Sequence, residues 1–443
     1  MALPDKAKPI LVSFGLFLIS TIIFFKGSYS VDSWKHYREM MSGQYSDWHS
    51  PLMPFAWKLV YKSTGFFSAF YILQMLLYWL LFYLVLREVK QWYLFAGVCV
   101  AAVLLLFIPQ YVMKDTHLSI AWGLAFLLLL HRPQNRRWYS AAIILVLITY
   151  GLWMRVNEVA AALPAIYLLC EVVVPGLSRI KKVLVTGSVS LILCFGYFVF
   201  TYKILGATHE YPEYKLMLQD LTGISKKTGT DYLSECLGSS PDYRKDTVMT
   251  LYNPASFDNI YWPAQGKNVP DPTHEIVSRT AAQWKKAMAR HPMVYLSNRW
   301  EGYLYFLKIK KRFAPVDYWN TAYWVDTNNP INLQCAGDPA ANFLDKKIWR
   351  RLARTPFFDG WFWLVLNSIV FVIFVRKYRS NNSLLNKAML CLQLSAIIYM
   401  LSQFPVFQHD RDFRYHYWNV MAFALGFVFL FDIREKHKES ELT

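Results

Sequence analysis

Long apolar stretches separated by short polar breaks run along this 443-residue chain. Many of the stretches approach about 20 residues, the length that an α-helix needs to cross the hydrocarbon core of a bilayer. The apolar runs and the breaks between them predict about ten membrane-spanning helices. These are expected near residues 9–27, 66–86, 92–109, 117–131, 138–154, 158–174, 183–205, 357–375, 384–404 and 417–433. The pattern therefore predicts an all-α integral membrane protein.

Two stretches of mixed polarity interrupt this pattern and are expected outside the membrane. Residues 28–65, which follow the first span, are rich in tryptophan and tyrosine, as is typical of amphipathic helices at a membrane interface. Residues 206–356 also carry many aromatic side chains and are expected to fold as a periplasmic loop domain. Within them, residues 274–309 have a helical periodicity that Pro292 should break. The predicted membrane domain is thus divided into residues 1–205, with seven spans, and residues 357–443, with three.

Charge assigns a side of the membrane to each loop and argues against a nucleic-acid partner. The chain is 55% hydrophobic with a formal net charge of +17, but its basic residues gather in alternate short loops and at both ends. Lysine and arginine favour the cytoplasmic side of short loops, so both termini are predicted to be cytoplasmic. The basic residues of this series are Lys6, Lys8, Arg87, Lys90, Arg132, Arg136, Arg137, Arg179, Lys181, Lys182, Arg376, Lys377, Arg379, Arg434, Lys436 and Lys438.

The six cysteines do not have the spacing of a zinc site or of a C-x-x-C redox motif. Four of them lie inside apolar runs and are expected to be small core residues. Cys236 and Cys335 are the only pair in the segment 206–356, and an oxidising compartment would allow them to form a disulfide. These patterns indicate no cofactor; a divalent cation is possible but is not indicated by the sequence.

Charged residues cluster where the predicted spans emerge on the external side. Asp32 stands a few residues after the first span, at the outer membrane–water boundary. A carboxylate that is partly screened from water there could accept a proton from a sugar hydroxyl. Its position alone, however, is more typical of an ordinary acidic residue in a solvated loop. Further clusters follow at residues 46–52, 114–115 and 409–415.

Four short motifs occur in order on this external side. They are Asp32-Ser33-Trp34-Lys35-His36-Tyr37 with Asp47-Trp48-His49-Ser50-Pro51-Leu52, then Val112-Met113-Lys114-Asp115-Thr116, Arg155-Val156-Asn157, and Asp412-Phe413-Arg414-Tyr415. Together they resemble the external motifs of GT-C glycosyltransferases, membrane enzymes that use polyprenyl-phosphate sugar donors. Ser50 departs from the family pattern, which has a first proline at that place.

The resemblance implies packed transmembrane helices under amphipathic external helices, a cavity at the outer leaflet, and inversion at the anomeric carbon of the sugar. It implies that Asp32 is the catalytic base and that Asp47 is either the alternate base or an acceptor-orienting group. A leaving phosphate bears growing negative charge, so fixed cations near it lower the barrier. The candidates for this role are Lys114, Arg411 and Arg414, with Arg155 behind them. The residues expected to orient substrates are Trp48, His49, Asp115, Asp410 and Tyr415.

Several of these candidate site residues also have a simpler interpretation. Lys114 and Asp115 could pair with each other in a tight turn. Arg411 and Arg414 could hold lipid headgroups, as cations beside a membrane often do. His49 is a single histidine, and a structural hydrogen bond is a simpler role for it than catalysis.

The resemblance implies an inverting glycosyltransferase in the inner membrane of a Gram-negative bacterium, with its active site in the periplasm. The sugar would pass from a polyprenyl-phosphate carrier, such as undecaprenyl phosphate, to a glycan or lipid acceptor such as O-antigen or lipopolysaccharide. A flippase and a polyprenyl-phosphate glycosyltransferase would act in the same pathway. Two alternatives remain open: an O-antigen polymerase or ligase with a diphosphate-linked donor, and a non-enzymatic transporter or flippase. A transporter should carry charges near the midplane at symmetric positions, whereas these charges lie at the outer rim.

Overall fold

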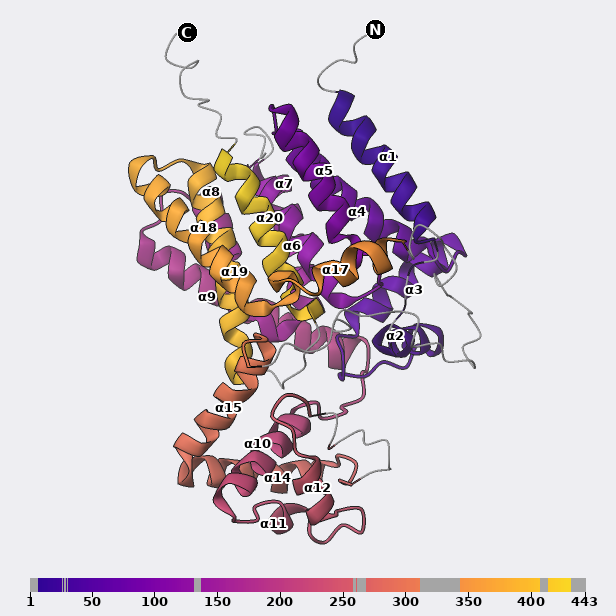
Figure 1. Ribbon diagram of the computed structural model, residues 1–443, viewed down its shortest axis with the longest axis vertical. Helices are drawn as coiled ribbons and strands as arrows, with labels where there is room; N and C mark the ends of the chain where they lie inside the picture. The colour runs from indigo at the N-terminus through magenta and orange to yellow at the C-terminus, as the bar shows by residue number, and fades with distance from the viewer. Residues whose placement is uncertain are drawn as a thin grey trace.

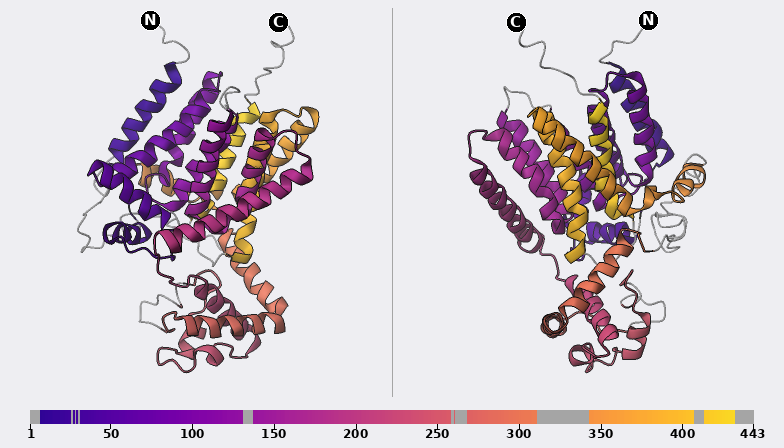
Figure 2. Two further views of the ribbon diagram at one scale, coloured as in Figure 1. Left: turned by 180° about the vertical axis from the view of Figure 1, so that it is seen from behind. Right: turned by 60° about the vertical axis from the view of Figure 1, so that its left-hand side comes forward.

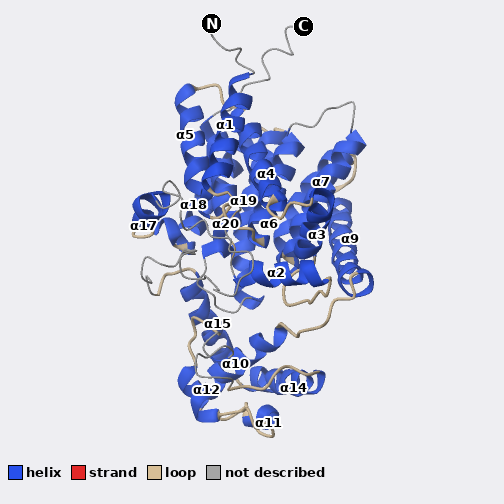
Figure 3. Ribbon diagram, turned by 90° about the vertical axis from the view of Figure 1, so that its right-hand side faces the viewer, coloured by secondary structure: helices blue, strands red, loops and turns tan. Residues whose placement is uncertain are grey.

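The computed structural model describes residues 7–25, 27, 29, 31–130, 137–257, 260, 268–310, 343–406 and 413–431. Within these residues every regular element is helical and no strand occurs (Figure 3). The predicted all-α class is therefore confirmed for this part of the chain.

Helices occupy all ten of the predicted apolar segments and pack into a bundle (Figure 1). They are α1 (Ala7–Ile23), α4 (Ala69–Leu86), α5 (Trp92–Leu104), α6 (Lys114–Leu130), α7 (Arg137–Met154), α8 (Val159–Val173), α9 (Arg179–Phe198), α18 (Gly360–Ser380), α19 (Leu384–Val406) and α20 (Tyr417–Phe431). Among the described residues, five helical segments are long and apolar enough to cross a membrane: Ala69–Leu86, Val156–Val173, Arg179–Ile204, Gly360–Ser380 and Leu384–Pro405. Shorter apolar helices are Ala7–Ile23, Trp92–Phe107 and Trp138–Met154. The structure therefore indicates a helical membrane protein.

Small residues and buried amide side chains set how closely the bundle helices approach one another. A Cβ added at Gly151 of α7 would lie 2.5 Å from the Trp122 ring of α6, so this close contact requires glycine. Gly426 of α20 likewise leaves room for the Gln393 amide of α19, which donates to the Ala422 carbonyl at 2.8 Å. Such bonds satisfy polar groups for which hydrocarbon offers no partner.

Several bundle helices have a tighter or wider turn at one end. The turns are 3₁₀ segments at Leu105–Phe107, Val156–Glu158 and Phe413–His416, and a π-helix at Val199–Ile204 that extends α9. π-helical turns occur often at functional sites. The turn after α9 carries Tyr202, which contacts the first loop as described below.

The segment between α1 and α4, here called the first loop, contains two helices, α2 (Val31–Ser42) and α3 (Leu52–Thr64), at one end of the bundle (Figure 1). Gly65 ends α3 in the left-handed conformation, with φ 67°. The Trp57 ring of α3 is fully buried and stacks on Phe70 of α4, with ring centroids 5.8 Å apart. The aromatic residues of this loop therefore hold α3 against the bundle.

The described residues between 206 and 310 form a small helical unit, here called the accessory domain, beyond the same end of the bundle (Figure 1, Figure 2). Its helices are α10 (Glu213–Thr228), α11 (Ser234–Leu237), α12 (Lys245–Leu251), α14 (His274–Arg290) and α15 (Pro292–Phe306). It has its own apolar core, which includes Tyr214, Leu218, Leu221, Ile224 and Val248. The helix predicted over 274–309 is confirmed from His274 to Phe306, with the predicted break directly before Pro292.

A buried ion pair and a helix contact organise the accessory domain and join it to the bundle. The Arg299 guanidinium of α15 donates to Asp220 of α10 at 2.6 Å, and Trp284 of α14 donates to the same carboxylate at 2.8 Å. The Tyr303 hydroxyl of α15 donates to the Met400 carbonyl of α19 at 3.1 Å. Helix α15 therefore connects the domain to the bundle.

The described chain resumes at residue 343 with short elements that pack on the bundle. They are a π-helix at Leu344–Trp349, α17 (Arg350–Leu352) and a 3₁₀ turn at Pro356–Phe358. The Trp349 indole donates to the Leu104 carbonyl of α5 at 3.1 Å. Cys236 is buried in the accessory domain, whereas Cys335 lies outside the described residues, so the disulfide between them stays a prediction.

The two ends of the bundle differ. The accessory domain, α2 and α3 lie at one end, here called the domain end, while α1 begins and α20 ends at the opposite end (Figure 1, Figure 2). The starts of α6 and α20 therefore lie at the domain end together with the ends of α1 and α7. This alternation in direction brings residues from distant parts of the sequence to one place.

Candidate functional site

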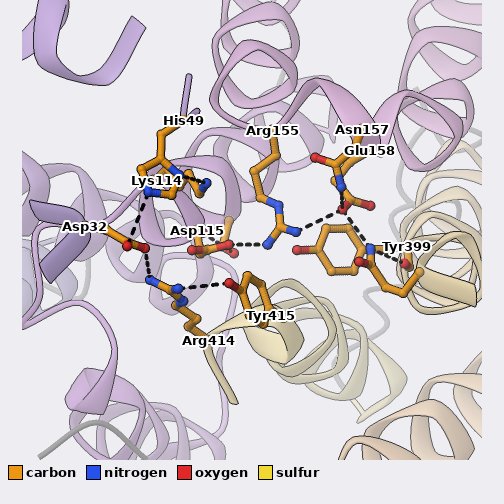
Figure 4. Close-up of polar contacts among 12 residues, drawn as sticks. Asp32, His49, Lys114, Asp115, Arg155, Asn157, Glu158, Tyr399, Arg414 and Tyr415 are labelled. Atoms are coloured by element: carbon orange, nitrogen blue, oxygen red, sulfur yellow. Dashed lines mark hydrogen bonds and ion pairs between the residues drawn. The ribbon is translucent and has the colours of Figure 1, made fainter. Parts of the chain in front are cut away.

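A group of polar side chains meets at the domain end of the bundle (Figure 4). We call this group the polar cluster. Its residues are Asp32, His49, Lys114, Asp115, Arg155, Asn157, Glu158, Tyr399, Arg414 and Tyr415. They come from the start of α2, the loop before α3, the start of α6, the segment between α7 and α8, the α19 helix, and the turn before α20.

Asp32 accepts hydrogen bonds from two sides. The Arg414 guanidinium donates to its Oδ2 at 2.5 Å, and His49 Nε2 lies 3.3 Å from its Oδ1. The other ring nitrogen of His49, Nδ1, lies 2.9 Å from Lys114 Nζ. Asp32 thus contacts Arg414 directly and reaches Lys114 through the His49 imidazole.

These groups lie outside the apolar spans, and their charges strongly affect one another. Burial alone would raise the pKa of Asp32, but Arg414, His49 and Lys114 outweigh it and hold the pKa well below its ordinary value. Burial lowers the pKa of Lys114 to about 8. Burial and the Lys114 charge lower the pKa of His49 to about 3. Near neutral pH the site therefore contains a carboxylate, a neutral imidazole and an ammonium that titrates in a physiological range.

Arg155 occupies the centre of the polar cluster, where two carboxylates balance its charge. Its guanidinium lies 2.5 Å from Asp115 and 3.4 Å from Glu158, and all three side chains are buried. It also stacks 4.7 Å from the centre of the Tyr415 ring. Arg414 lies 4.9 Å from the same ring and donates to its hydroxyl at 2.9 Å. Tyr415 therefore links the two arginines, and Arg155 supports Arg414.

Sequence reasoning missed two residues of the polar cluster, Glu158 and Tyr399, whose ring centre lies 5.9 Å from the Arg155 guanidinium. Glu158 is fully buried at the start of a segment that is long and apolar enough to cross a membrane. Besides Arg155, it accepts from the Gln403 amide at 2.7 Å and from the Asn157 amide at 2.7 Å. A carboxylate among apolar residues is itself a sign of a functional or structural site. That sign was present in the sequence, directly after the Arg155-Val156-Asn157 motif.

Asp47 and Trp48 face the accessory domain and have no direct contact with Asp32 among the described residues. Asp47 accepts from the Tyr202 hydroxyl at 2.7 Å, from the backbone N–H of Glu210 at 2.7 Å, and closely from His209. The Lys215 ammonium of α10 lies 3.8 Å from the centre of the Trp48 ring. These two residues fix the first loop to the base of the accessory domain, so the sequence motif splits into two parts with different surroundings.

The contacts of Lys114, Asp115 and Ser50 bear on the simpler roles of these residues. Among the described residues, the direct partner of Lys114 is His49 and that of Asp115 is Arg155, although Asp115 also acts on Lys114 through its charge. Asp410 and Arg411 lie outside the described residues, and their roles stay predictions. Ser50, at the departure from the family pattern, donates to the Trp153 carbonyl at the end of α7. The serine therefore ties the first loop to that helix.

In the part of the chain that the structure describes, no set of three or more histidine, cysteine or acidic side chains has an arrangement that could hold a metal ion. In comparisons with known proteins, no family model, no curated protein and no solved structure matches this chain. The resemblance to GT-C enzymes therefore depends on the short sequence motifs alone.

The polar cluster has the groups needed to move a proton next to an anion. Asp32 is a carboxylate that can accept a proton, and Lys114 and Arg414 are cations that can stabilise a phosphate. Arg155 is already balanced by Asp115 and Glu158, so it fits a supporting role better than direct contact with a phosphate.

Proposed function

We propose that the protein is an inverting glycosyltransferase that uses a polyprenyl-phosphate sugar donor and acts at the polar cluster. The observation that carries the proposal is the contact of Asp32 with Arg414 and, through His49, with Lys114. These are the base and the phosphate partners that the motifs imply. Their place at one end of an apolar bundle suits a donor with a lipid tail and a charged headgroup.

In the proposed reaction, an acceptor hydroxyl oxygen attacks the anomeric carbon of the donor sugar. The bond between that carbon and the phosphate oxygen breaks, and its electron pair leaves with the polyprenyl phosphate. The hydroxyl proton passes to Asp32, while Arg414 and Lys114 stabilise the charge on the leaving phosphate. Attack from the side opposite the leaving group inverts the configuration of the sugar.

The ion pair between Asp32 and Arg414 suggests how the donor would activate the base. In the free site, Arg414 holds the pKa of Asp32 low, which makes this carboxylate a weak base. A donor phosphate would compete for the Arg414 guanidinium, which is well suited to bind phosphate in a two-pronged manner. Once Arg414 binds the phosphate instead of Asp32, burial would raise the proton affinity of Asp32. The carboxylate would then be a stronger base at the step in which it deprotonates the acceptor.

We expect about ten membrane crossings in a bacterial inner membrane, with both termini cytoplasmic and the domain end in the periplasm. Support comes from the common end at which α1 begins and α20 ends, opposite the accessory domain (Figure 1). Alkaline-phosphatase fusions at residues 35, 115, 250 and 410 should be active, and a fusion at residue 380 should be inactive. An active fusion at 380, or an inactive one at 250, would contradict this topology.

The proposed activity can be tested on purified protein in nanodiscs. Synthetic polyprenyl-phosphate sugars are supplied as donors, with lipopolysaccharide or an isolated glycan as acceptor, and the product is followed by mass spectrometry. Transfer with inversion supports the proposal. Transfer only from diphosphate-linked donors would favour a polymerase or ligase. Movement of lipid-linked sugar across proteoliposomes without any product would favour a transporter.

Donor binding should depend on the protonation of Lys114. Its pKa of about 8 means that the ammonium is charged below about pH 8 and becomes neutral as the pH rises through that value. The KM for the donor should therefore increase between pH 7 and pH 9. Lys114→Arg stays charged over this range, and its KM should remain flat. Lys114→Ala should lower the rate by about 10²–10³ at pH 7, as removal of a stabilising charge commonly does.

The same rise of KM in Lys114→Arg would show that another group causes the pH dependence. Near-wild-type turnover in both Lys114→Ala and Arg414→Ala would place the phosphate site elsewhere.

A further inference from the structure

His49 lies between two groups of opposite charge, the Lys114 ammonium and the Asp32 carboxylate (Figure 4). An ammonium only donates hydrogen bonds, so His49 Nδ1 must accept from Lys114. The ring proton then lies on Nε2 and points toward Asp32. This arrangement selects a single neutral tautomer, and the imidazole separates the two charges.

The other contacts of these residues explain why such a separation matters. The charged groups that act on Lys114 are Asp115 on its own helix, Asp32 on α2, Arg155 after α7, and Arg414 before α20. Asp115 follows Lys114 directly on α6 and acts on it in the wild-type protein already. Removal of the imidazole opens a new contact only toward Asp32, the carboxylate on the other side of the ring. Asp32 would then bind both of the cations that a donor phosphate needs.

We propose that His49 is a positioning residue, a neutral spacer that prevents Lys114 from pairing directly with Asp32. One N–H of the ammonium binds the imidazole, and the other two remain directed to an anionic group of the substrate. The use of those donors by a donor phosphate rests on the proposed function. The separation of Lys114 from Asp32 does not depend on it.

The titration of Lys114 tests the spacer directly. Competitive amine labelling across pH, read out for the Lys114 peptide by mass spectrometry, compares the wild-type protein with His49→Leu and His49→Gln. In His49→Leu, direct pairing with Asp32 should raise the midpoint by about one pH unit or more, because a nearby opposite charge favours the charged form. The His49→Gln amide can accept from Lys114 and donate to Asp32, so its midpoint should stay near the wild-type value.

A matched control is His36→Leu. His36 is the neighbouring buried imidazole, with ring centroids 5.3 Å from His49, but its charged partner is Glu39. This variant should leave the Lys114 midpoint unchanged. If His49→Leu does not fold, His49→Asn serves in its place, since its shorter amide cannot reach both partners and should give the same upward shift.

The donor supplies a second measurement. With a synthetic polyprenyl-phosphate sugar, His49→Leu should have a KM raised about tenfold or more, and His49→Gln should recover most of this loss. An unchanged Lys114 midpoint in both His49→Leu and His49→Asn would overturn the spacer, even if the wild-type protein transfers sugar. A Lys114 midpoint that rises in His49→Leu, in a protein that neither binds nor transfers any lipid-linked sugar, would support the spacer role of His49 and refute the proposed function.

Discussion

Asp32→Asn should abolish sugar transfer while the protein still folds and binds donor. A general base commonly contributes about 10²–10⁴ to the rate, and the asparagine amide cannot serve as one. It also cannot pair electrostatically with Arg414, which contacts Asp32 at 2.5 Å in the wild-type protein. Product formation and donor binding are measured separately in nanodiscs. A lost rate with retained binding identifies Asp32 as the base.

The matched control is Asp47→Asn, which makes the same change in the other predicted catalytic acid. Asp47 binds Tyr202 and the backbone of Glu210, so its loss should loosen the first loop and cause a smaller or acceptor-dependent defect. Substantial activity in Asp32→Asn, together with none in Asp47→Asn, would reverse the two roles. Full activity in both variants would remove the basis for placing catalysis at either acid.

Arg155→Leu should strongly destabilise the bundle, because it leaves Asp115 and Glu158 buried without their shared cation. Removing one partner of a buried ion pair costs about 3–5 kcal/mol, since an uncompensated charge remains in a medium of low dielectric constant. The expected result is a large fall in thermal stability in detergent and a reduced yield of folded protein.

The variants Arg155→Lys and Arg87→Leu are the controls for Arg155→Leu. Arg155→Lys keeps the charge but cannot hold both carboxylates with a planar fork, so an intermediate loss is expected. Arg87→Leu removes an arginine whose side chain is 41% exposed and pairs with Glu88 at 3.3 Å. An exposed pair of this kind contributes about 0–1 kcal/mol. Equal stabilities of Arg155→Leu and Arg87→Leu would show that Arg155 is not the structural centre of the polar cluster.

Much of the fold could be predicted from local sequence patterns. Apolar runs of membrane-spanning length indicated each bundle helix, because the hydrocarbon of a membrane leaves a backbone few ways to satisfy its own hydrogen bonds. The break at Pro292 followed from the missing N–H and fixed φ of proline. The ends of α1, α5 and α18 were harder to predict, because the last turns of a helix depend on the partners that the surrounding structure provides for their backbone groups.

The candidate site was predicted in part, and the difference is instructive. Asp32, Lys114 and Arg414 stood out because each is a charge at the edge of an apolar run. Asp47 looked equivalent to Asp32 in sequence, yet its carboxylate binds Tyr202 in the turn after α9 and Glu210 at the base of the accessory domain. Two acids separated by 15 positions in one loop therefore have different partners, which depend on the direction that each side chain takes in the folded loop.

The sequence by itself determined the helical class, the apolar segments and the positions of the charges along the chain. Only the tertiary structure decided which charges meet. Asp32 and Arg414 are 382 positions apart, and Glu158 and Gln403 are 245 apart. Contacts of this kind depend on the packing of whole helices. Apolar periodicity predicts which face of a helix is buried. It does not predict which helix packs against that face or which side chains of that helix make the contact.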